Sequence, residues 1–589
     1  MIKKLLSFFT EKEINIAIFI FILVVIGAGL EVLSLSLFAL FIGLFLDTNL
    51  EIYNWILNNS IIDLIDKSIN ELILIFGIVT GLFFLIKNSY LLYINFILHR
   101  FIYNKYTQLS VQLLQKYIEM PYLKHLEINS SFLQRNVNTE VFWLFANIFV
   151  PGITLLTELV IVSVVILALF YLNPLSTIVL ILSFVLLLGL IMITIKKKMD
   201  LMGSISQSYF GEMIKSVNQS LGGIKVTKVS GTQSFFLDAY RSNIENYSQN
   251  TARLKNISQW PRYLVEVILV CAVVISAIYM TRGGSELKIN LSVLSFFAMA
   301  GIRLMPSFNR ITSSYTNIRY YSASLNVIFK ELNDASFSSK NPQQISKLSL
   351  KKEIEFNNVS FNYPGVVKNS IKDLSFKIKK GDLVSFVGRS GSGKTTIVDL
   401  LCGLLETNNG KILVDGVNIS NNLTEWQKLI SYVPQDIYLL DDSLRNNIAY
   451  GVHPDEIDDE LIEYVCKLAM LNSYIEELDF GYETRIGENG VKMSGGQRQR
   501  LGIARALYEQ PEVLILDEGT AALDNMAQEF IMNSINSIAN KITVITIAHR
   551  LDTIKNSDLI FLIEEGQLKK QLTREMINNL DNSFTKLFD

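Results

Sequence analysis

Six long apolar segments lie in the first 330 residues, and they constrain the fold of this region more than any other feature. A helix needs about 20 apolar residues to cross the hydrocarbon core of a bilayer. The segments that reach this length are residues 14–46, 71–98, 139–172, 174–195, 260–281 and 291–315. A bundle of buried soluble helices is the alternative, but soluble helices usually keep a polar face. The sequence therefore predicts an all-α membrane domain of six spanning helices over residues 1–330.

The lysines and arginines between these segments are distributed unevenly. Residues 1–13, 99–138 and 196–259 together contain 17 of them, whereas the stretches on the opposite side contain three. Cytosolic loops of membrane proteins carry the excess of positive charge. The distribution therefore predicts that the N-terminus, these basic stretches and the region after residue 330 are cytosolic.

The two longer cytosolic stretches are amphipathic and too long to be simple turns. We expect helical extensions that carry short crossing segments near Pro121–Arg135 and Gly222–Tyr240, where the membrane domain would contact the C-terminal domain. Unstructured basic loops are the alternative. On the outer side, isoleucines alternate with polar residues over 47–70. This pattern is typical of an amphipathic helix at the membrane interface, although ordinary packing onto the bundle would also explain it.

Ionisable side chains occur within the predicted spans, where such residues usually face a cavity or a partner. The cations between mid-membrane and the inner leaflet are Lys87, Arg262, Arg303 and Arg310. Arg303 and Arg310 are seven residues apart and share a helix face, with Ser307 between them. Together the four cations could bind a phosphate or pyrophosphate head group. The alternatives are snorkelling to the interface and an ion pair of Arg262 with Glu266 one turn away.

Residues 388–396, Gly-Arg-Ser-Gly-Ser-Gly-Lys-Thr-Thr, have the spacing of a phosphate-binding loop. In such a loop the glycines let backbone N–H groups approach a nucleotide phosphate, the lysine reaches the β- and γ-phosphates, and the next hydroxyl binds Mg²⁺. A predicted strand at 383–387 precedes the loop and a predicted helix at 395–402 follows it, as the motif requires. The expected nucleotide ligands are Gly388, Ser390, Gly391, Gly393, Lys394, Thr395 and Thr396, with Thr395 also holding the metal.

Two further motifs lie in residues 354–589, where short β-rich runs alternate with helical stretches and predict an α/β domain. Residues 513–518 form a predicted strand that ends in Asp517, which could hold Mg²⁺, and Glu518, which could polarise the attacking water. Ser494, Gly495, Gly496 and Gln497 precede a predicted helix whose free N–H groups could bind a γ-phosphate. We therefore predict an ATP-hydrolysing domain, joined to the membrane domain by a linker at 331–353.

With these motifs in this order, the chain resembles the ATP-binding cassette (ABC) transporters, and specifically a half-transporter of the exporter type. The resemblance implies that Tyr363 stacks on adenine, that Gln435 senses Mg²⁺ and the γ-phosphate, and that His549 contacts the γ-phosphate. In this family the signature motif of one chain, here 494–497, completes the ATP site of another. A homodimer with two ATP molecules is therefore expected, although a different partner chain is possible.

Residues 303–311 resemble the last span of the PglK-type flippases, which move lipid-linked oligosaccharides in bacterial N-glycosylation. This resemblance implies ATP-driven flipping of a polyprenyl-pyrophosphate oligosaccharide from the inner to the outer leaflet of a bacterial inner membrane. Two alternatives stay open: an exporter of drugs, peptides or other lipids, and a non-transporting regulator or channel. Because the net charge is only −2, we do not expect a nucleic-acid partner.

Overall fold

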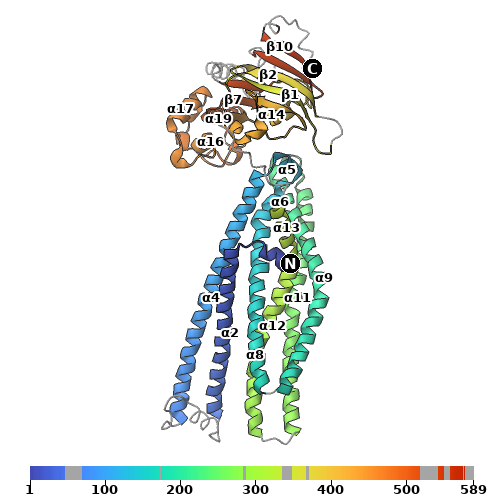
Figure 1. The fold of residues 1–589 in the computed structure, drawn as a ribbon, viewed down its shortest axis with the longest axis vertical. Helices are drawn as coiled ribbons and strands as arrows, with labels where there is room; N and C mark the ends of the chain where they lie inside the picture. Colours follow the sequence, from blue (N-terminus) through green and yellow to red (C-terminus); the bar gives the residue numbers. More distant parts are fainter. Residues whose placement is uncertain are drawn as a thin grey trace. The chain divides into compact units, whose positions relative to one another are not determined.

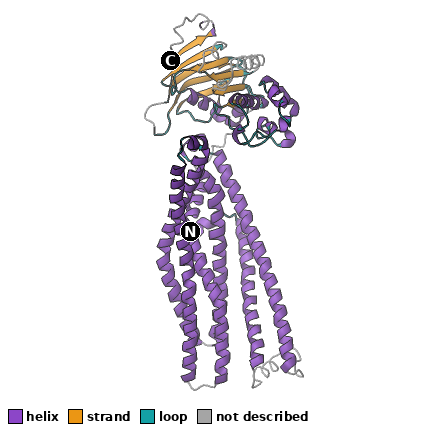
Figure 2. Ribbon diagram, turned by 180° about the vertical axis from the view of Figure 1, so that it is seen from behind, coloured by secondary structure: helices purple, strands orange, loops and turns teal. Residues whose placement is uncertain are grey.

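The computed structural model covers the whole chain and describes residues 1–46, 69–172, 174–282, 287–334, 348–365, 370–517, 542–548, 557–574 and 576. The chain divides into two compact units. The first comprises Met1–Met120 and Lys124–Ser338, and the second comprises Pro121–Leu123 and Ser339–Asp589. The first unit is drawn as helices, and the second as strands with helices beside them (Figures 1 and 2).

The first unit is built on long helices that run alongside one another (Figure 1). They are α2 (Glu11–Leu46), α4 (Ile69–Glu119), α8 (Val150–Leu172), α9 (Pro174–Gly222), α11 (Gln233–Arg282) and α12 (Leu287–Tyr320). The shorter helices are α1 (Ile2–Leu6), α5 (Tyr122–Glu127, whose first two residues belong to the second unit), α6 (Ser130–Arg135), α7 (Val141–Leu144), α10 (Ile224–Val229) and α13 (Ser322–Asn333). Helix α4 has 51 residues. At 1.5 Å per residue it extends about 75 Å, far beyond the roughly 30 Å of a bilayer core. The predicted helical extensions are therefore confirmed for this helix.

Within the described residues, three helical segments are long and apolar enough to cross a membrane: Glu11–Phe38, Ile73–Glu119 and Ser130–Leu167. They overlap the first three predicted spans. The other three predicted spans fall in α9, α11 and α12, whose side chains are described only in part. The total of six spans therefore stays a prediction. Most of the outer segment predicted at 47–70, residues 47–68, lies outside the described residues, as do linker residues 335–347.

Short helices occupy parts of both predicted crossing segments. Helices α5 and α6 lie within 121–135, and α10 lies within 222–240 after the break at Gly222–Gly223. These parts are therefore helical rather than unstructured basic loops. The linker predicted at 331–353 is shorter at both ends, because α13 continues to Asn333 and the first strand begins at Glu353.

Apolar side chains and a chain of polar contacts join α4 to α7 and α13. Leu113, Leu144 and Ile328 lie in this core and have no exposed surface. Beside them, Asn136 Nδ2 donates to Tyr117 Oη at 2.9 Å, and Tyr117 Oη donates to Glu331 Oε2 at 3.0 Å. Buried polar groups need such partners, so this part of the bundle has a specific helix register.

Two sheets form the second unit (orange in Figure 2). One has the order β10-β9-β3-β8-β7-β6 and the other the order β2-β1-β4-β5. The strands are β1 (Glu353–Phe361), β2 (Ile371–Lys379), β3 (Leu383–Val387), β4 (Asn409–Val414), β5 (Val417–Asn418), β6 (Ile430–Val433), β7 (Val513–Asp517), β8 (Thr543–Ile547), β9 (Leu559–Glu564) and β10 (Gln567–Thr573). The helices are α14 (Lys394–Leu401), α15 (Leu423–Gln427), α16 (Leu444–Ile448), α17 (Asp459–Leu468), α18 (Asn472–Glu476) and α19 (Gly495–Tyr508). The predicted α/β domain is confirmed.

The strands from β9 to β6 in the larger sheet are parallel, and those at its centre are mostly apolar. Every residue of β3, β7 and β8 is buried, as parallel sheets covered on both faces require. The polar Ser385 in β3 is accommodated because its Oγ lies 2.8 Å from Thr546 Oγ1 and 2.7 Å from Ser557 Oγ. The central strands are therefore held in place by buried contacts, and the predicted phosphate-binding loop follows one of them, β3.

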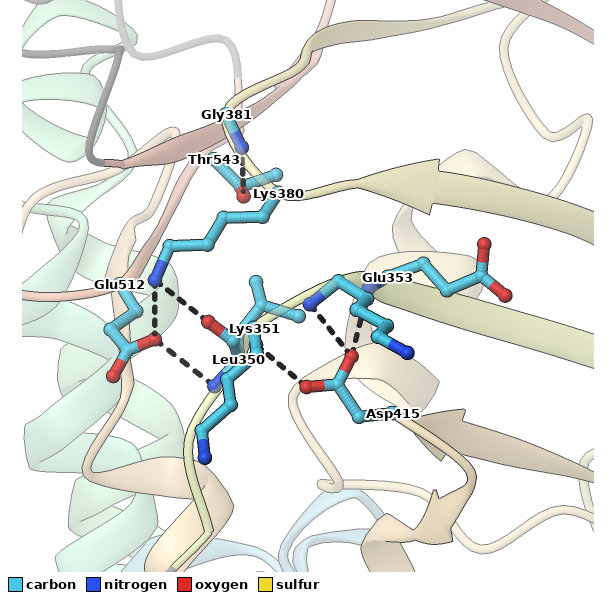
Figure 3. Close-up of polar contacts among 9 residues, drawn as sticks. Leu350, Lys351, Glu353, Lys380, Gly381, Asp415, Glu512 and Thr543 are labelled. Carbon is cyan, nitrogen blue, oxygen red and sulfur yellow. Dashed lines mark hydrogen bonds and ion pairs between the residues drawn. The ribbon is translucent and has the colours of Figure 1, made fainter.

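Two carboxylates fix the point where the chain enters the second unit (Figure 3). Asp415, in the tight turn between β4 and β5, accepts hydrogen bonds from the backbone N–H groups of Lys351, Lys352 and Glu353 at 2.6–2.9 Å. Partial burial raises the pKa of this carboxyl, but the three N–H donors outweigh it and lower the pKa below its usual value. Glu512 accepts from Leu350 N at 3.0 Å. The Asp415 anchor is therefore lost only as the pH falls through that lowered pKa.

Candidate nucleotide-binding site

The predicted nucleotide-binding residues follow the carboxyl ends of neighbouring parallel strands. The phosphate loop follows β3, Asp517 ends β7, and Gln435 lies two residues beyond β6. The register pairs Val433 with Leu516 and Asp517 with Ile547, so these strand ends meet at one edge. Ligands of open α/β sheets bind at this edge. The structure therefore places the loop, Asp517 and Gln435 on the same side of the sheet.

The backbone of the phosphate loop requires glycine at its two ends. Gly388 has φ +157°, and a Cβ there would lie 2.1 Å from the carbonyl oxygen of Ile563. Gly393 has φ +106° and precedes α14, where a Cβ would lie 2.9 Å from Ile371 Cδ1. No side chain caps the N-terminus of α14. Its N–H groups therefore stay available to an anion, as in phosphate-binding loops.

The side chains of the loop fit a phosphate ligand. Lys394 is 5% exposed, and its Nζ donates to the carbonyl oxygens of Gly388 at 2.7 Å and Arg389 at 3.0 Å. The ammonium group is thus held inside the loop. Ser392 Oγ is buried and has no hydrogen-bond partner within the described structure. An unused polar atom in a tight glycine loop is consistent with a site that binds a polar ligand.

Negative charge is concentrated where a metal ion is predicted. Asp517 is 7% exposed, and Tyr432 Oη donates to its Oδ2 at 3.1 Å. Burial, reinforced by the nearby Asp517 carboxylate, raises the pKa of Asp399 to about 6. A bound cation would relieve this repulsion. The oxygen ligands that Mg²⁺ prefers are thus present. They are the carboxylate of Asp517 at the end of β7 and the exposed hydroxyl of Thr395 in the first turn of α14.

Tyr363 lies beside the loop helix. Its hydroxyl is 3.4 Å from Thr396 Oγ1, and its ring packs edge-on against Phe361, with 4.9 Å between the ring centroids. Tyr363 is only partly buried. The structure thus brings this aromatic side chain to the phosphate loop, and its role in adenine stacking stays a prediction.

The signature motif begins helix α19. Ser494 is the N-cap: its Oγ accepts from Gln497 N at 3.2 Å, while Gln497 Oε1 accepts from Ser494 N at 2.8 Å. This reciprocal capping box leaves the N–H groups of Gly495 and Gly496 for another acceptor. No hydrogen bond among the described residues joins 494–497 to the phosphate loop of the same chain. Use of this motif by a second chain stays a prediction.

Sequence reasoning missed Arg505 and Asn447, which fix the segment after Gln435. Arg505 Nη1 donates to Tyr438 O at 2.8 Å, and its Nε donates to Asn447 O at 2.8 Å. Asn447 Oδ1 accepts from Leu440 N at 2.9 Å. These contacts tie α19 to residues 438–447. No local pattern reveals them, because they join positions far apart in the sequence. The capping box has a local signal in the Ser-x-x-Gln spacing of residues 494–497, but it was not predicted either.

Several predicted residues lie outside the described part of the chain. They are Glu518 and His549, which directly follow the described Asp517 and Ala548. Their roles stay predictions. The side chain of Arg303 is also outside the description, although its backbone lies within α12.

The other predicted substrate cations have separate surroundings. Lys87 is buried, with its Nζ 3.4 Å from Ser34 Oγ and 4.6 Å from the centre of the Phe84 ring. Arg310 Nε donates to the carboxylate of Glu158. Arg262 is exposed, and no ion pair joins it to Glu266 among the described residues. Its role stays a prediction. The described contacts therefore do not join these cations into one cluster.

Comparison with known proteins identifies the class of the second unit. Residues 371–521 match the family model of the ABC transporters. The second unit is thus an ABC-type ATP-binding cassette. The whole chain is similar to the structure of a bacterial Atm1-family ABC exporter with ATP bound, with a TM-score of 0.79 and 23% identity over 97% of each chain. The chain therefore has the ABC exporter fold.

Individual relatives share a flippase name. The chain is 30% identical over 387 residues to the ATP-dependent lipid A-core flippase of Methylobacillus flagellatus, and 32% identical over 367 residues to that of Pseudomonas aeruginosa. The identity to the same flippase of Legionella pneumophila (strain Lens) is 33% over 388 residues. The matches cover 66%, 62% and 65% of this chain. They cover 65%, 59% and 64% of the relatives, so the chain spans slightly less than two thirds of their length.

Proposed function

We propose that this protein is an ATP-hydrolysing translocase that flips a phosphorylated glycolipid from the inner to the outer leaflet of a bacterial inner membrane. The observation that carries the proposal is the phosphate-binding loop of Gly388–Thr396, held at the edge of a parallel sheet in a chain with an exporter fold. The flippase names of the relatives support a lipid cargo. The finer proposal is a polyprenyl-pyrophosphate oligosaccharide. A lipid A-core is the second candidate, because the relatives carry that name.

The proposed ATP site uses residues from two identical chains. Lys394 and the loop N–H groups would hold the β- and γ-phosphates, and Tyr363 would stack on adenine. Mg²⁺, when bound, would neutralise phosphate charge beside Thr395, Gln435 and Asp517. Glu518 would orient the attacking water, and His549 would contact the γ-phosphate. The capped α19 of the second chain would supply the N–H groups of Gly495 and Gly496, which its capping box leaves unused.

The proposed substrate contacts are Lys87, Arg262, Arg303 and Arg310, which would hold the phosphate groups of the lipid while its tail stays in the bilayer. The crossing segments near 121–135 and 222–240 would transmit closure of the cassettes to the spans. Both features are proposals that follow from charge and position along the helices.

Stimulation of ATP hydrolysis distinguishes a glycolipid cargo from a hydrophobic drug. We expect the purified protein in lipid nanodiscs to hydrolyse ATP several-fold faster with a polyprenyl-pyrophosphate oligosaccharide or lipid A-core than without either. A panel of hydrophobic drugs should leave the rate unchanged. The measurement is steady-state phosphate release. Stimulation by drugs alone would instead identify a multidrug exporter, and no hydrolysis at all would favour a regulator or channel.

A further inference from the structure

A buried acid and a buried hydroxyl accompany Arg310 where helices α8 and α12 meet. Glu158 on α8 is 5% exposed, and its Oε1 accepts the hydrogen bond from Arg310 Nε. Apolar neighbours on the same two helices, Ile161 and Leu304 among them, form a core cluster with at most 8% exposure. An ion pair beside such a cluster is costly in a membrane and usually has a function.

The polar groups at this place are incompletely paired. Glu158 Oε2 and Ser307 Oγ are both buried and have no hydrogen-bond partner among the described residues. A helical serine or threonine commonly bonds to the carbonyl four residues earlier. Thr312 and Thr316 on the same helix do so, at 2.9 Å and 2.7 Å. Ser307, with no exposed surface, does not. Two orphaned polar atoms near one ion pair indicate that a partner is missing.

The unused groups define the chemistry of that partner. Glu158 Oε2 can only accept a hydrogen bond while ionised, so its partner must be a donor. The Arg310 side chain is 43% exposed, and Glu158 engages its Nε. The terminal guanidinium nitrogens have no hydrogen-bond partner among the described residues and suit a phosphate. These groups therefore suit a ligand that offers an anionic phosphate and a hydrogen-bond donor, such as a hydroxyl, together.

We propose that Glu158, Ser307 and Arg310 form a selectivity site for a glycosyl phosphate. Arg310 binds a phosphate oxygen, while a hydroxyl of the first sugar donates to Glu158 Oε2 and Ser307 Oγ donates to the sugar. The proposal rests on the proposed flippase function and assigns a role to Glu158 and Ser307. Because Glu158 already neutralises Arg310, an anionic lipid with no hydrogen-bond donor in its head group gains little and leaves the carboxylate unpaired. The acid thus disfavours lipids such as phosphatidic acid and a sugar-free polyprenyl pyrophosphate.

Binding by the full-length protein in detergent tests this assignment, using native mass spectrometry. The probes are a polyprenyl pyrophosphate with and without a disaccharide, and phosphatidic acid. Wild-type protein should prefer the glycosylated lipid at least tenfold. Glu158→Gln should remove most of that preference, chiefly by binding the two sugar-free lipids more tightly. Ser307→Ala should lower the preference about threefold without breaking the ion pair, which keeps the test valid if Glu158→Gln does not fold.

The matched control is Ser163→Ala on α8, because Ser163 Oγ already donates to Leu159 O at 2.7 Å. It should leave the preference unchanged. If the ion pair is purely structural, Glu158→Gln should unfold at a lower temperature but keep the wild-type ratio of lipid affinities. That result would overturn the selectivity site without contradicting the proposed cargo class. If wild-type protein binds no glycosylated lipid, the proposed cargo class is wrong and the selectivity site with it.

Discussion

Replacing Lys394 with alanine should weaken ATP binding by about a hundredfold or more and abolish ATP hydrolysis. The ammonium group is buried in the loop, where two carbonyl oxygens hold it at 2.7 Å and 3.0 Å. Charge-assisted hydrogen bonds contribute about 1.5–3 kcal/mol each, so losing those to the β- and γ-phosphates accounts for an effect of this size. Calorimetric titration with ATP measures the affinity, and phosphate release measures the activity.

The control for Lys394 is Lys467→Ala, because Lys467 lies on the exposed face of α17 and, among the described residues, pairs with Glu463 one turn away. Exposed pairs of this kind contribute a few tenths of a kcal/mol. Lys467→Ala should therefore match wild type in both measurements. Hydrolysis within twofold of wild type in Lys394→Ala would show that residues 388–396 are not the catalytic phosphate loop.

Replacing Gly203 with alanine should destabilise the membrane domain by about 3 kcal/mol or more. Helices α9 and α12 approach so closely here that a Cβ would lie 1.8 Å from the backbone oxygen of Tyr320. No rotamer change relieves a clash with a backbone atom, so the helices must separate. Overpacking in a well-packed core typically costs about 1–3 kcal/mol. Separation would also strain the 2.7 Å hydrogen bond between Tyr320 Oη and Ser206 Oγ nearby.

Thermal unfolding in detergent, followed by intrinsic fluorescence, measures this effect. Gly189→Ala is the matched control on the same helix, because a Cβ there meets no atom within 4 Å. It should be neutral or slightly stabilising, since alanine favours a helix by up to about 1 kcal/mol over glycine. Equal unfolding temperatures for the two variants would contradict the close approach of α9 and α12.

Local pattern was sufficient for the central elements of the cassette. The strand predicted at 383–387 is observed with the same bounds, and the helix predicted at 395–402 begins one residue earlier, at Lys394. The strand follows from a short apolar run. The start of the helix follows from a motif whose glycines restrict the loop to a particular backbone conformation. Because these constraints are local, the sequence alone reveals the loop, its strand and its helix.

Tertiary contacts between distant positions could not be predicted in this way. Glu158 and Arg310 are 152 positions apart, and only the packing of α8 against α12 brings them together. The raised pKa of Asp399, on α14, likewise depends on burial by the fold and on Asp517, which ends β7. The sequence showed that Arg310 is an expensive cation within a span. It did not show that a buried acid already neutralises it, and that pairing changes which lipid the site would select.

Movement of a labelled lipid across vesicles tests the proposed function most directly. Proteoliposomes with outward-facing cassettes would carry a fluorescent phosphorylated glycolipid in their outer leaflet, with a membrane-impermeant quencher added after incubation. Wild-type protein should protect the label from quenching only when ATP and Mg²⁺ are present, and Lys394→Ala should give no protection. Protection of equal extent without ATP, or none in wild-type vesicles that hydrolyse ATP, would contradict ATP-driven flipping of a phosphorylated glycolipid.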